Sequence, residues 1–316
     1  MRVVIVGAGL CGLVAGRQLV DAGAEVLLFD KGRSPGGRLA TRRIGSATLD
    51  HGAQFFTVRT PALQRRVDDW IDRGLVSIWT HGFGSEDGHP RYVAVSGMNS
   101  LAKDLAGDLD VRCSTMVFAI RPAPAGRSTS SWNVVIDDGT VHAADAVIVT
   151  TPLPQAFALL ADSEIRLDES LMRTDYDRTI ALLATLDRAS AVPAPGGLQA
   201  PTPELNFVAD NAAKGVSATP AITAHASAAW SEAHWDAHLD DLRTSLIDMV
   251  GPWLGDARII EAQVKKWRFA TPRSAWPDPC WIAEGGTVVL AGDAFDGPRI
   301  EAAHNSGLAA AHALVG

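Results

Sequence analysis

The first thirty residues constrain the fold of this chain more than any other stretch. They begin with an apolar run at 3–6, which predicts a buried parallel strand, and continue with Gly7, Gly9 and Gly12 in the spacing G-x-G-x-x-G. In a β-α-β unit the first glycine permits a tight turn, the second lets the backbone approach a pyrophosphate, and the third lets helix and strand pack closely. A second predicted strand ends at Asp30, whose carboxylate can accept hydrogen bonds from ribose hydroxyls. The pattern therefore predicts a dinucleotide-binding site.

Length and composition argue against several other classes of function. The chain has 316 residues, enough for two domains, and a net charge of −8, which argues against the basic surface that nucleic-acid binding needs. No apolar stretch reaches the ~20 residues of a membrane span. The three cysteines show no C-x-x-C spacing, and the pair His234 and His238 lacks the glutamate of H-E-x-x-H, so we expect neither a disulfide framework nor a metal site. These features favour a reduced, cytoplasmic protein with no nucleic-acid or membrane partner.

The order of the predicted elements indicates two domains. The first and last thirds of the chain alternate helical and strand patterns, whereas the middle is rich in strands and has no phosphate-binding loop. We expect a discontinuous cofactor-binding domain with a substrate domain inserted between its pieces. The predicted ranges are 1–57, 94–152 and 268–316 for the first domain, and 58–93 and 153–267 for the second.

Capping and turn residues predict several boundaries within these domains. A helix is expected to begin at Pro61, after a threonine that can cap it, and to end at Gly74. A strand is predicted within 111–120, followed by the turn-rich residues 121–130. Ser231 is predicted to cap a long amphipathic helix.

The glycine fingerprint alone leaves NAD and FAD open as the bound dinucleotide, and later segments favour FAD. The glycines of 36–38 let the chain pass close to a ligand, and the arginine can pair with phosphate oxygens; the segment resembles the R-x-G-G-R motif of the amine oxidase superfamily. A buried strand followed by Gly292 and Asp293 resembles the C-terminal FAD motif of the same superfamily. A helix from about Ile300 would direct the positive end of its dipole at the flavin.

More specific segments resemble the bacterial renalase group within the flavin amine oxidase superfamily. They occur in that group's order through essentially the whole chain: DKGRSPGGRLATRR, LDHGAQFFTVR, GMNSLAKDL, VIVTTPLPQA, HASAAWS, KWRFATP and GDAFDGPRIEAAHNSG. The resemblance implies an α/β protein with a two-domain, glutathione-reductase-like FAD/NAD(P) Rossmann fold. It also implies an inserted α+β substrate domain that contains a mostly antiparallel sheet.

The resemblance further implies an FAD-dependent oxidase with non-covalent FAD. Its expected substrates are the 2- or 6-dihydro isomers of NAD(P)H, which would be oxidised to NAD(P)+ by hydride transfer to flavin N5, with O2 reduced to H2O2. A dihydropyridine is already a hydride donor, so this chemistry needs orientation more than acid–base groups. The alternatives are a flavin amine or C–N oxidase of a biosynthetic pathway, and a flavin-binding regulatory protein with little turnover. Either a monomer or a homodimer is expected.

Three features depart from the patterns of these relatives. Amine oxidases carry a lysine near N5 on the first strand of the substrate domain, but the comparable stretch here, YDRTIALLATL, contains none. Phe55 stands where bacterial renalase relatives have tyrosine, so a hydroxyl contact is lost there. His51 replaces a residue that is usually apolar beside the flavin.

The motifs and the resemblance together assign candidate site residues. His225 and Trp267 are the catalytic candidates; a core histidine and a core tryptophan are the alternative interpretations. The predicted cofactor-binding residues are Gly7, Gly9, Leu10, Cys11, Gly12, Asp30, Lys31, Gly37, Arg38, His51, Gly52, Ala53, Gln54, Val117, Gly292, Asp293, Glu301 and Ala302. The predicted substrate-binding residues are Arg43, Phe55, His225, Trp267 and His304. For Arg43 and its neighbour Arg42, an exposed loop pair is the alternative.

Overall fold

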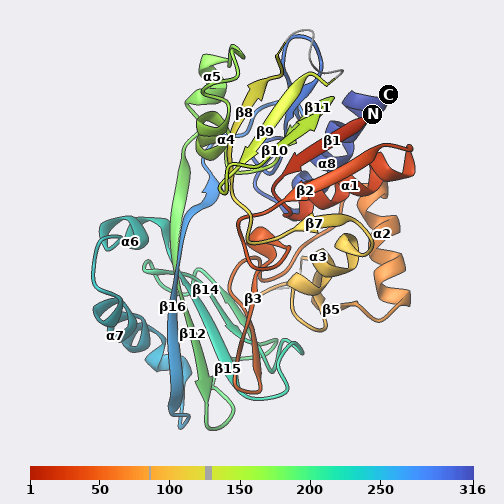
Figure 1. The fold of residues 1–316 in the computed structure, drawn as a ribbon. Coiled ribbons are helices and arrows are strands. Elements are labelled where there is room, and N and C mark those ends of the chain that lie inside the picture. The colour runs from red at the N-terminus through yellow and green to blue at the C-terminus, as the bar shows by residue number, and fades with distance from the viewer. Residues whose placement is uncertain (85–86, 125–129) are drawn as a thin grey trace. The chain divides into compact units, whose positions relative to one another are not determined.

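The computed structural model describes residues 1–84, 87–124 and 130–316, and its backbone divides into two compact units (Figure 1). Part of the predicted loop at 121–130 lies outside the described residues. Unit 1 comprises Met1–Gly37, Ala102–Asp175 and Pro272–Gly316, and unit 2 comprises Arg38–Leu101 and Tyr176–Thr271. Both units are therefore assembled from segments that are distant in the sequence.

The boundaries of these units differ from the predicted ranges. Residues 38–57, 94–101 and 268–271 lie in unit 2, and residues 153–175 lie in unit 1. One reason is the hairpin of β3 (Thr41–Ile44) and β4 (Ala47–Asp50), which packs on the sheet of unit 2. The buried apolar residues of that contact are Ile44, Ala47, Leu49, Leu183 and Ala221.

Unit 1 is built on a six-stranded sheet with the strand order β17-β18-β11-β1-β2-β7. The bounds in that order are Trp281–Ile282, Val288–Leu290, Ala146–Val149, Arg2–Val6, Glu25–Phe29 and Asp110–Arg112. All neighbouring strands are parallel except β17, which runs antiparallel to β18. The central strands are continuous apolar runs because a parallel sheet is covered on both faces.

Two helices of unit 1 pack against each other, α1 (Leu10–Asp21) and α8 (Ile300–Val315). Their close approach requires a glycine, because a Cβ atom at Gly307 would lie 2.4 Å from the carbonyl oxygen of Cys11. The remaining elements of unit 1 are the antiparallel strands β8 (Val117–Pro122), β9 (Trp132–Ile136) and β10 (Val141–Ala144), and the helices α4 (Leu153–Leu159) and α5 (Glu169–Met172). The predicted strand within 111–120 is divided into β7 and β8, because Ser114 between them has a φ of 54°.

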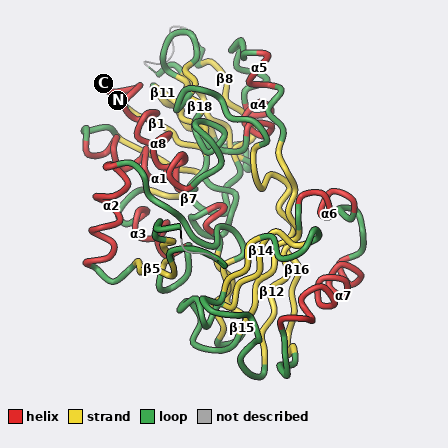
Figure 2. Tube along the Cα trace, turned by 180° about the vertical axis from the view of Figure 1, so that it is seen from behind, coloured by secondary structure: helices red, strands yellow, loops and turns green. Residues whose placement is uncertain are grey.

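Unit 2 is built on a five-stranded, mostly antiparallel sheet, as predicted, with the order β13-β14-β15-β12-β16. The bounds in that order are Gly197–Gln199, Leu205–Asp210, Ala221–Ala226, Tyr176–Leu186 and Ile259–Pro272. Figures 1 and 2 show α6 (Ala228–Ala233) and α7 (Leu239–Val250) beside this sheet, and a short 3₁₀ turn, Gly251–Trp253, follows α7. Leu242, Leu246 and Val250 of α7 pack against the apolar residues of β12, β14 and β15.

The predicted capping role of Ser231 is wrong. Ser227 caps α6, accepting a hydrogen bond from the amide of Trp230, and α7 begins separately at Leu239. The hydroxyl of Ser231 is buried instead, where it accepts a hydrogen bond from the amide of Ile180 at 3.0 Å. A serine inside a helix can satisfy a strand amide as well as it can cap a helix, so its residue type did not distinguish the two roles.

Other helices flank the core of unit 2. The predicted helix at Pro61 is confirmed as α2 (Pro61–Asp72), and Gly74 has a φ of 70° just after its end. The remaining elements are the hairpin of β5 (Val76–Thr80) and β6 (Arg91–Ala94), the 3₁₀ turn Gly37–Leu39, and α3 (Asn99–Ala106), which spans a boundary between the units.

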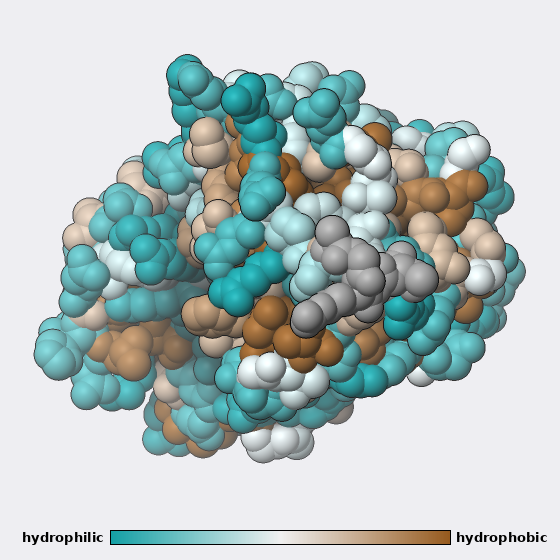
Figure 3. Space-filling view, turned by 45° about the horizontal axis from the view of Figure 1, so that its top comes forward, coloured by the Kyte–Doolittle hydropathy of each residue, from teal (hydrophilic) through white to brown (hydrophobic). Residues whose placement is uncertain are grey.

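The surface is mainly hydrophilic on the face shown in Figure 3, where hydrophobic residues form separate small patches. Among the described residues, no helix is both long enough and apolar enough to cross a membrane.

Candidate active site

The glycine loop of unit 1 contains two glycines that the protein's own packing requires. Gly7 has a φ of 106°, and a Cβ atom there would lie 2.6 Å from the hydroxyl oxygen of Thr150. A Cβ atom at Gly12 would lie 2.0 Å from the carbonyl oxygen of Gly7. Gly9 is different, since a Cβ atom there meets nothing within 4 Å and its φ of −75° is open to any residue. Space for a ligand therefore adjoins the backbone at Gly9.

The first turn of α1 faces this space with its backbone amides. Gly9 is the N-cap, no side chain caps the helix, and no acidic residue lies in its first turn. The first backbone hydrogen bond of the helix runs from the amide of Leu13 to the carbonyl of Gly9. An uncapped helix N-terminus carries partial positive charge and free N–H groups, which suit a phosphate.

Asp30 supports the glycine loop directly. One carboxylate oxygen accepts a hydrogen bond from the amide of Ala8 at 2.7 Å, and the other accepts one from the amide of Gly32 at 2.6 Å. The amide of Thr115 donates to the carbonyl of Asp30 at 3.0 Å, which brings the segment before Val117 to the same place. Asp30 directly follows β2, and Val117 begins β8 two residues after Thr115; contact of either residue with an adenosine stays a prediction.

The C-terminal motif also returns to the glycine loop. Gly292 follows β18 with a φ of 143°, and its amide donates to the hydroxyl of Ser306 in α8 at 2.8 Å. Glu301 and His304 of α8 are buried, and Nδ1 of His304 lies 3.2 Å from Oδ1 of Asn305. The side chain of Lys31 points elsewhere, because its ammonium donates to Gln155 at 3.2 Å.

Unit 1 therefore brings most of the predicted nucleotide-binding residues to one edge of its sheet. Gly9 and Gly36 form a parallel bridge, and a Cβ atom at Gly37 would lie 3.5 Å from Cα of Gly9. The predicted site residues in this unit are Gly7, Gly9, Leu10, Cys11, Gly12, Asp30, Lys31, Gly37, Val117, Gly292, Asp293, Glu301, Ala302 and His304.

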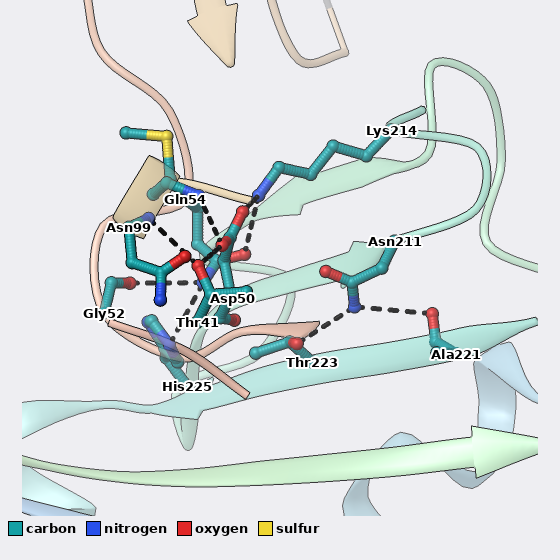
Figure 4. A network of polar contacts seen from close by, with 11 residues as sticks. Thr41, Asp50, Gly52, Gln54, Asn99, Asn211, Lys214, Ala221, Thr223 and His225 are labelled. Atoms are coloured by element: carbon teal, nitrogen blue, oxygen red, sulfur yellow. Dashed lines mark hydrogen bonds and ion pairs between the residues drawn. The ribbon is translucent and has the colours of Figure 1, made fainter. Parts of the chain in front are cut away.

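Several predicted residues of unit 2, including Gly52, Gln54 and His225, lie at a buried polar network that Figure 4 shows from close by. Its centre is Asp50, at the end of β4, which is fully buried. One oxygen of its carboxylate accepts hydrogen bonds from the hydroxyl of Thr41 at 2.6 Å and from the amide of Met98 at 2.8 Å. The other oxygen contacts the ammonium of Lys214 at 2.9 Å.

Sequence reasoning missed Asp50 and Lys214 as functional residues. Asp50 begins the D-H-G-A-Q segment, so that motif contained the signal. Lys214 lies in the connection between β14 and β15, where a lysine is ordinarily exposed, and nothing in the pattern indicated that its side chain is wholly buried. Burial lowers the pKa of Lys214, and the Asp50 carboxylate opposes that shift.

Two partly buried histidines and a tryptophan lie next to this network. Trp267 of β16 stacks on the ring of His51 with centroids 5.3 Å apart, and its indole N–H donates to the His51 carbonyl at 2.7 Å. Nε2 of His225, on β15, lies 3.5 Å from the side-chain nitrogen of Gln54. Burial lowers the pKa of both histidines to about 4. Nearby positive charge from Lys265 acts in the same direction on His51. Both rings are therefore neutral at physiological pH.

Phe55 belongs to a cluster of four aromatic rings in unit 2. Its ring centroid lies 5.2 Å from that of Phe83 and 5.8 Å from that of Phe207, and Trp79 closes the cluster. The sequence alone did not reveal this group, because its members come from three stretches of the chain, around Phe55, at Trp79 and Phe83, and at Phe207. The cluster offers a partly exposed aromatic surface, and Phe55 directly follows Gln54 of the polar network in the sequence.

The arginines of the predicted site differ in their environments. The guanidinium of Arg38 donates to the carbonyls of Phe269 and Ala270 in β16, at 3.5 and 3.2 Å. Arg43 is exposed on β3 opposite Thr48, whereas Arg42 beside it is half-buried, so the two arginines lie on a strand and substrate binding by Arg43 stays a prediction. The predicted site residues in unit 2 are Arg38, Arg43, His51, Gly52, Ala53, Gln54, Phe55, His225 and Trp267.

Each unit, taken by itself, has a feature that suits a ligand. In unit 1 the open backbone at Gly9 and the uncapped start of α1 provide the place for a diphosphate. In unit 2 the buried Nδ1 of His51 has no hydrogen-bond partner within the described part of the chain, so it can receive one from a ligand. Among the same described residues, no group of three or more His, Cys, Asp or Glu side chains is arranged to hold a metal ion.

Comparison with known families decides the class of the dinucleotide. A model described as NAD(P)-binding Rossmann-like domain matches residues 5–70, and one described as flavin containing amine oxidoreductase matches residues 73–315, well over half of the chain. The chain belongs to the flavin-containing amine oxidoreductase family. It is thus an FAD-dependent oxidoreductase, and the choice of FAD over NAD as the bound cofactor is confirmed.

Individual relatives match this chain to different extents. Renalase of Mus musculus is 28% identical over 203 residues, which are 57% of this chain and 57% of the relative. Lysine-specific histone demethylase 1 homolog 1 of Arabidopsis thaliana is 55% identical, but only over 43 residues, 14% of this chain and 5% of its own. The chain thus spans just over half the length of the mouse renalase.

Solved structures confirm the fold. The A394C mutant of putrescine oxidase superposes with a TM-score of 0.72 at 14% identity, covering 100% of this chain and 99% of that one. At this identity the likeness establishes a shared fold and leaves the substrate open.

Proposed function

We propose that this protein is a renalase-like oxidase that converts 2- or 6-dihydro isomers of NAD(P)H to NAD(P)+, with O2 as the final electron acceptor and H2O2 as the reduced product. The extent of the renalase match carries the proposal, because it spans 57% of the chain, whereas the histone demethylase homolog matches 14%. The segments D-H-G-A-Q-F-F-T and K-W-R-F-A-T-P, which resemble the bacterial renalase group, lie at the polar network and on β16.

The environments of the two histidines support this chemistry. When bound, FAD supplies the acceptor for the hydride. Loss of hydride turns a dihydropyridine into an aromatic cation, so the surrounding residues need not remove a proton and should not carry positive charge against the product. His51 and His225 meet this condition, because burial lowers the pKa of each to about 4. Trp267 adds a flat apolar face, stacked on His51, against which a planar ring can be oriented.

A second candidate function is a flavin amine or C–N oxidase. The family itself and the structural likeness to putrescine oxidase favour it. One observation argues against this second candidate. Amine oxidases carry a lysine near N5 on the first strand of the substrate domain, but β12, the comparable strand here, contains no lysine. A third candidate, a flavin-binding protein with little turnover, would share the same cofactor cradle.

Anaerobic mixing of the yellow holoprotein with separate reductants distinguishes the three. Rapid bleaching of the flavin band by the 2- or 6-dihydro isomer, with slow or no bleaching by the 4-dihydro isomer, supports the renalase-like function. Bleaching by amines alone contradicts it and supports the second candidate. No bleaching by any donor leaves only the third.

Two variants test the assignment of the site in the same assay. Trp267→Phe and His225→Asn are expected to slow bleaching while the FAD content of the purified protein stays at the wild-type level. Loss of FAD from either variant would show that these residues hold the cofactor or the fold and are not part of the substrate face.

A further inference from the structure

The buried amide of Gln54 has contacts on both of its polar atoms. Its Oε1 lies 3.4 Å from the ammonium of Lys214. Its Nε2 lies 2.8 Å from the backbone carbonyl of Asp50 and 3.1 Å from that of Gly52 (Figure 4). Both Gln54 and Lys214 are buried, so water does not compete for these positions.

These contacts leave one orientation for the amide. Exchanging its oxygen and nitrogen would place an N–H group against the Lys214 ammonium, which has only protons to offer. The same exchange would place the amide oxygen against two carbonyl oxygens, at 2.8 and 3.1 Å. Because three contacts agree, the nitrogen of Gln54 is the atom that faces His225.

The orientation of Gln54 decides where His225 carries its proton. Nε2 of His225 lies 3.5 Å from the Gln54 nitrogen, and an amide nitrogen cannot accept a hydrogen bond. A proton on that Nε2 would point at a donor, so Nε2 holds a lone pair. The neutral ring must then carry its proton on Nδ1, and a hydrogen bond between His225 and the backbone of His51 is consistent with that arrangement.

We propose that Gln54 is a positioning residue that holds His225 as the neutral tautomer protonated on Nδ1, with Lys214 and two backbone carbonyls fixing the amide of Gln54. The link to catalysis rests on the proposed function, but the tautomer itself does not. The two protons of the Gln54 amide are directed at the carbonyls of Asp50 and Gly52, so Nε2 of His225 lies against this nitrogen without a full hydrogen bond. With Nε2 turned towards the protein, His225 meets a substrate through its ring carbons and acts neither as an acid nor as a base. A neutral imidazole also leaves a cationic product unopposed. The charged and titratable groups that act on it are Lys214 and His51, and both lower its pKa.

Nuclear magnetic resonance of histidine labelled with ¹⁵N tests this assignment in the holoprotein without any substrate. The two-bond ¹H–¹⁵N pattern of His225, identified by its loss in His225→Asn, is expected to be that of the Nδ1–H tautomer and to stay unchanged between about pH 5.5 and 8. Gln54→Glu replaces the donor with an acceptor, so the pattern should change to Nε2–H or to the doubly protonated ring. Gln54→Met, which leaves the Lys214–Asp50 pair in place, should give a mixture of both tautomers. This variant provides the test if Gln54→Glu does not fold.

A matched control and a kinetic readout complete the experiment. Gln199→Glu makes the same chemical change at an exposed position on β13 and should leave the His225 pattern unaltered. In Gln54→Glu, flavin reduction should become slower as the pH falls, because a protonated His225 opposes the cationic product. The proposal is overturned if wild-type His225 carries its proton on Nε2, or if Gln54→Glu leaves its pattern unchanged. If the NMR results hold but no dihydro isomer bleaches the flavin, the proposed function fails and the positioning role stands.

Discussion

Lys214→Met would leave the carboxylate of Asp50 buried without the ammonium that now lies 2.9 Å from it. At that separation and an effective dielectric constant of about 20, the attraction is worth about 6 kcal/mol before desolvation is subtracted. The hydrogen bonds from Thr41 and from the amide of Met98 remain and offset part of the loss. We therefore expect the free energy of unfolding to fall by about 3–5 kcal/mol, as for other broken buried pairs.

A double-mutant cycle in urea measures this effect on the holoprotein. Asp50→Asn combined with Lys214→Met removes both charges, so the double variant should be more stable than the sum of the single losses by about 2 kcal/mol or more. Lys103→Met, at an exposed position in α3, is the control and should change the free energy of unfolding by less than about 0.5 kcal/mol. Additive single losses, or a loss below about 1 kcal/mol in Lys214→Met, would refute the reasoning.

Three further predictions concern the glycine loop, the histidines and the indole. Gly9→Ala should leave the Tm of the FAD-free protein unchanged and weaken FAD binding at least about 10-fold, whereas Gly12→Ala, whose Cβ would lie 2.0 Å from a backbone oxygen, should lower that Tm; calorimetry and FAD titration check both. His51 and His225 have folded-state pKa values of about 4, below the ordinary 6.5, so between these pH values the unfolded chain binds more protons than the folded one. The free energy of unfolding should therefore be highest above pH 6.5 and should fall as the pH falls towards 4. Urea unfolding should show a decline of up to about 1.4 kcal/mol per pH unit for each ring, and His225→Asn should remove one ring's share. Trp267→Phe loses the hydrogen bond to the His51 carbonyl and should cost about 1 kcal/mol in urea unfolding; no measurable cost would show that this bond contributes nothing.

The nucleotide-binding part of the fold was predictable because its requirements are local. A Cβ atom at Gly12 would meet the carbonyl oxygen of Gly7 within the loop, and one at Gly7 would meet Thr150, which follows the neighbouring strand β11. Of the three glycines, only Gly9 leaves room for a Cβ atom, a distinction that the spacing does not contain.

The substrate side was less predictable because its contacts are distant in the sequence. Lys214 meets Asp50 across 164 positions, and a lysine gives no local sign that it is buried. Ser231 was assigned to a helix cap because capping is the common role of serine before a helical pattern. In the structure its hydroxyl instead accepts a hydrogen bond from the amide of Ile180, 51 positions earlier. The predicted domain boundaries also differ from the bounds of the two compact units, in part because the β3–β4 hairpin packs on β12 and β15.

The packing of α1 on α8 has a consequence for how the protein matures. The glycine loop is made before α8 during synthesis, yet Gly307 of α8 packs against Cys11, and the amide of Gly292 donates to the hydroxyl of Ser306 in α8. Strands β11 and β18, which lie on one side of β1 in the sheet, are also made after β1. The growing chain therefore cannot complete this packing until α8 has left the ribosome, so we expect FAD to be acquired only after α8 has been made.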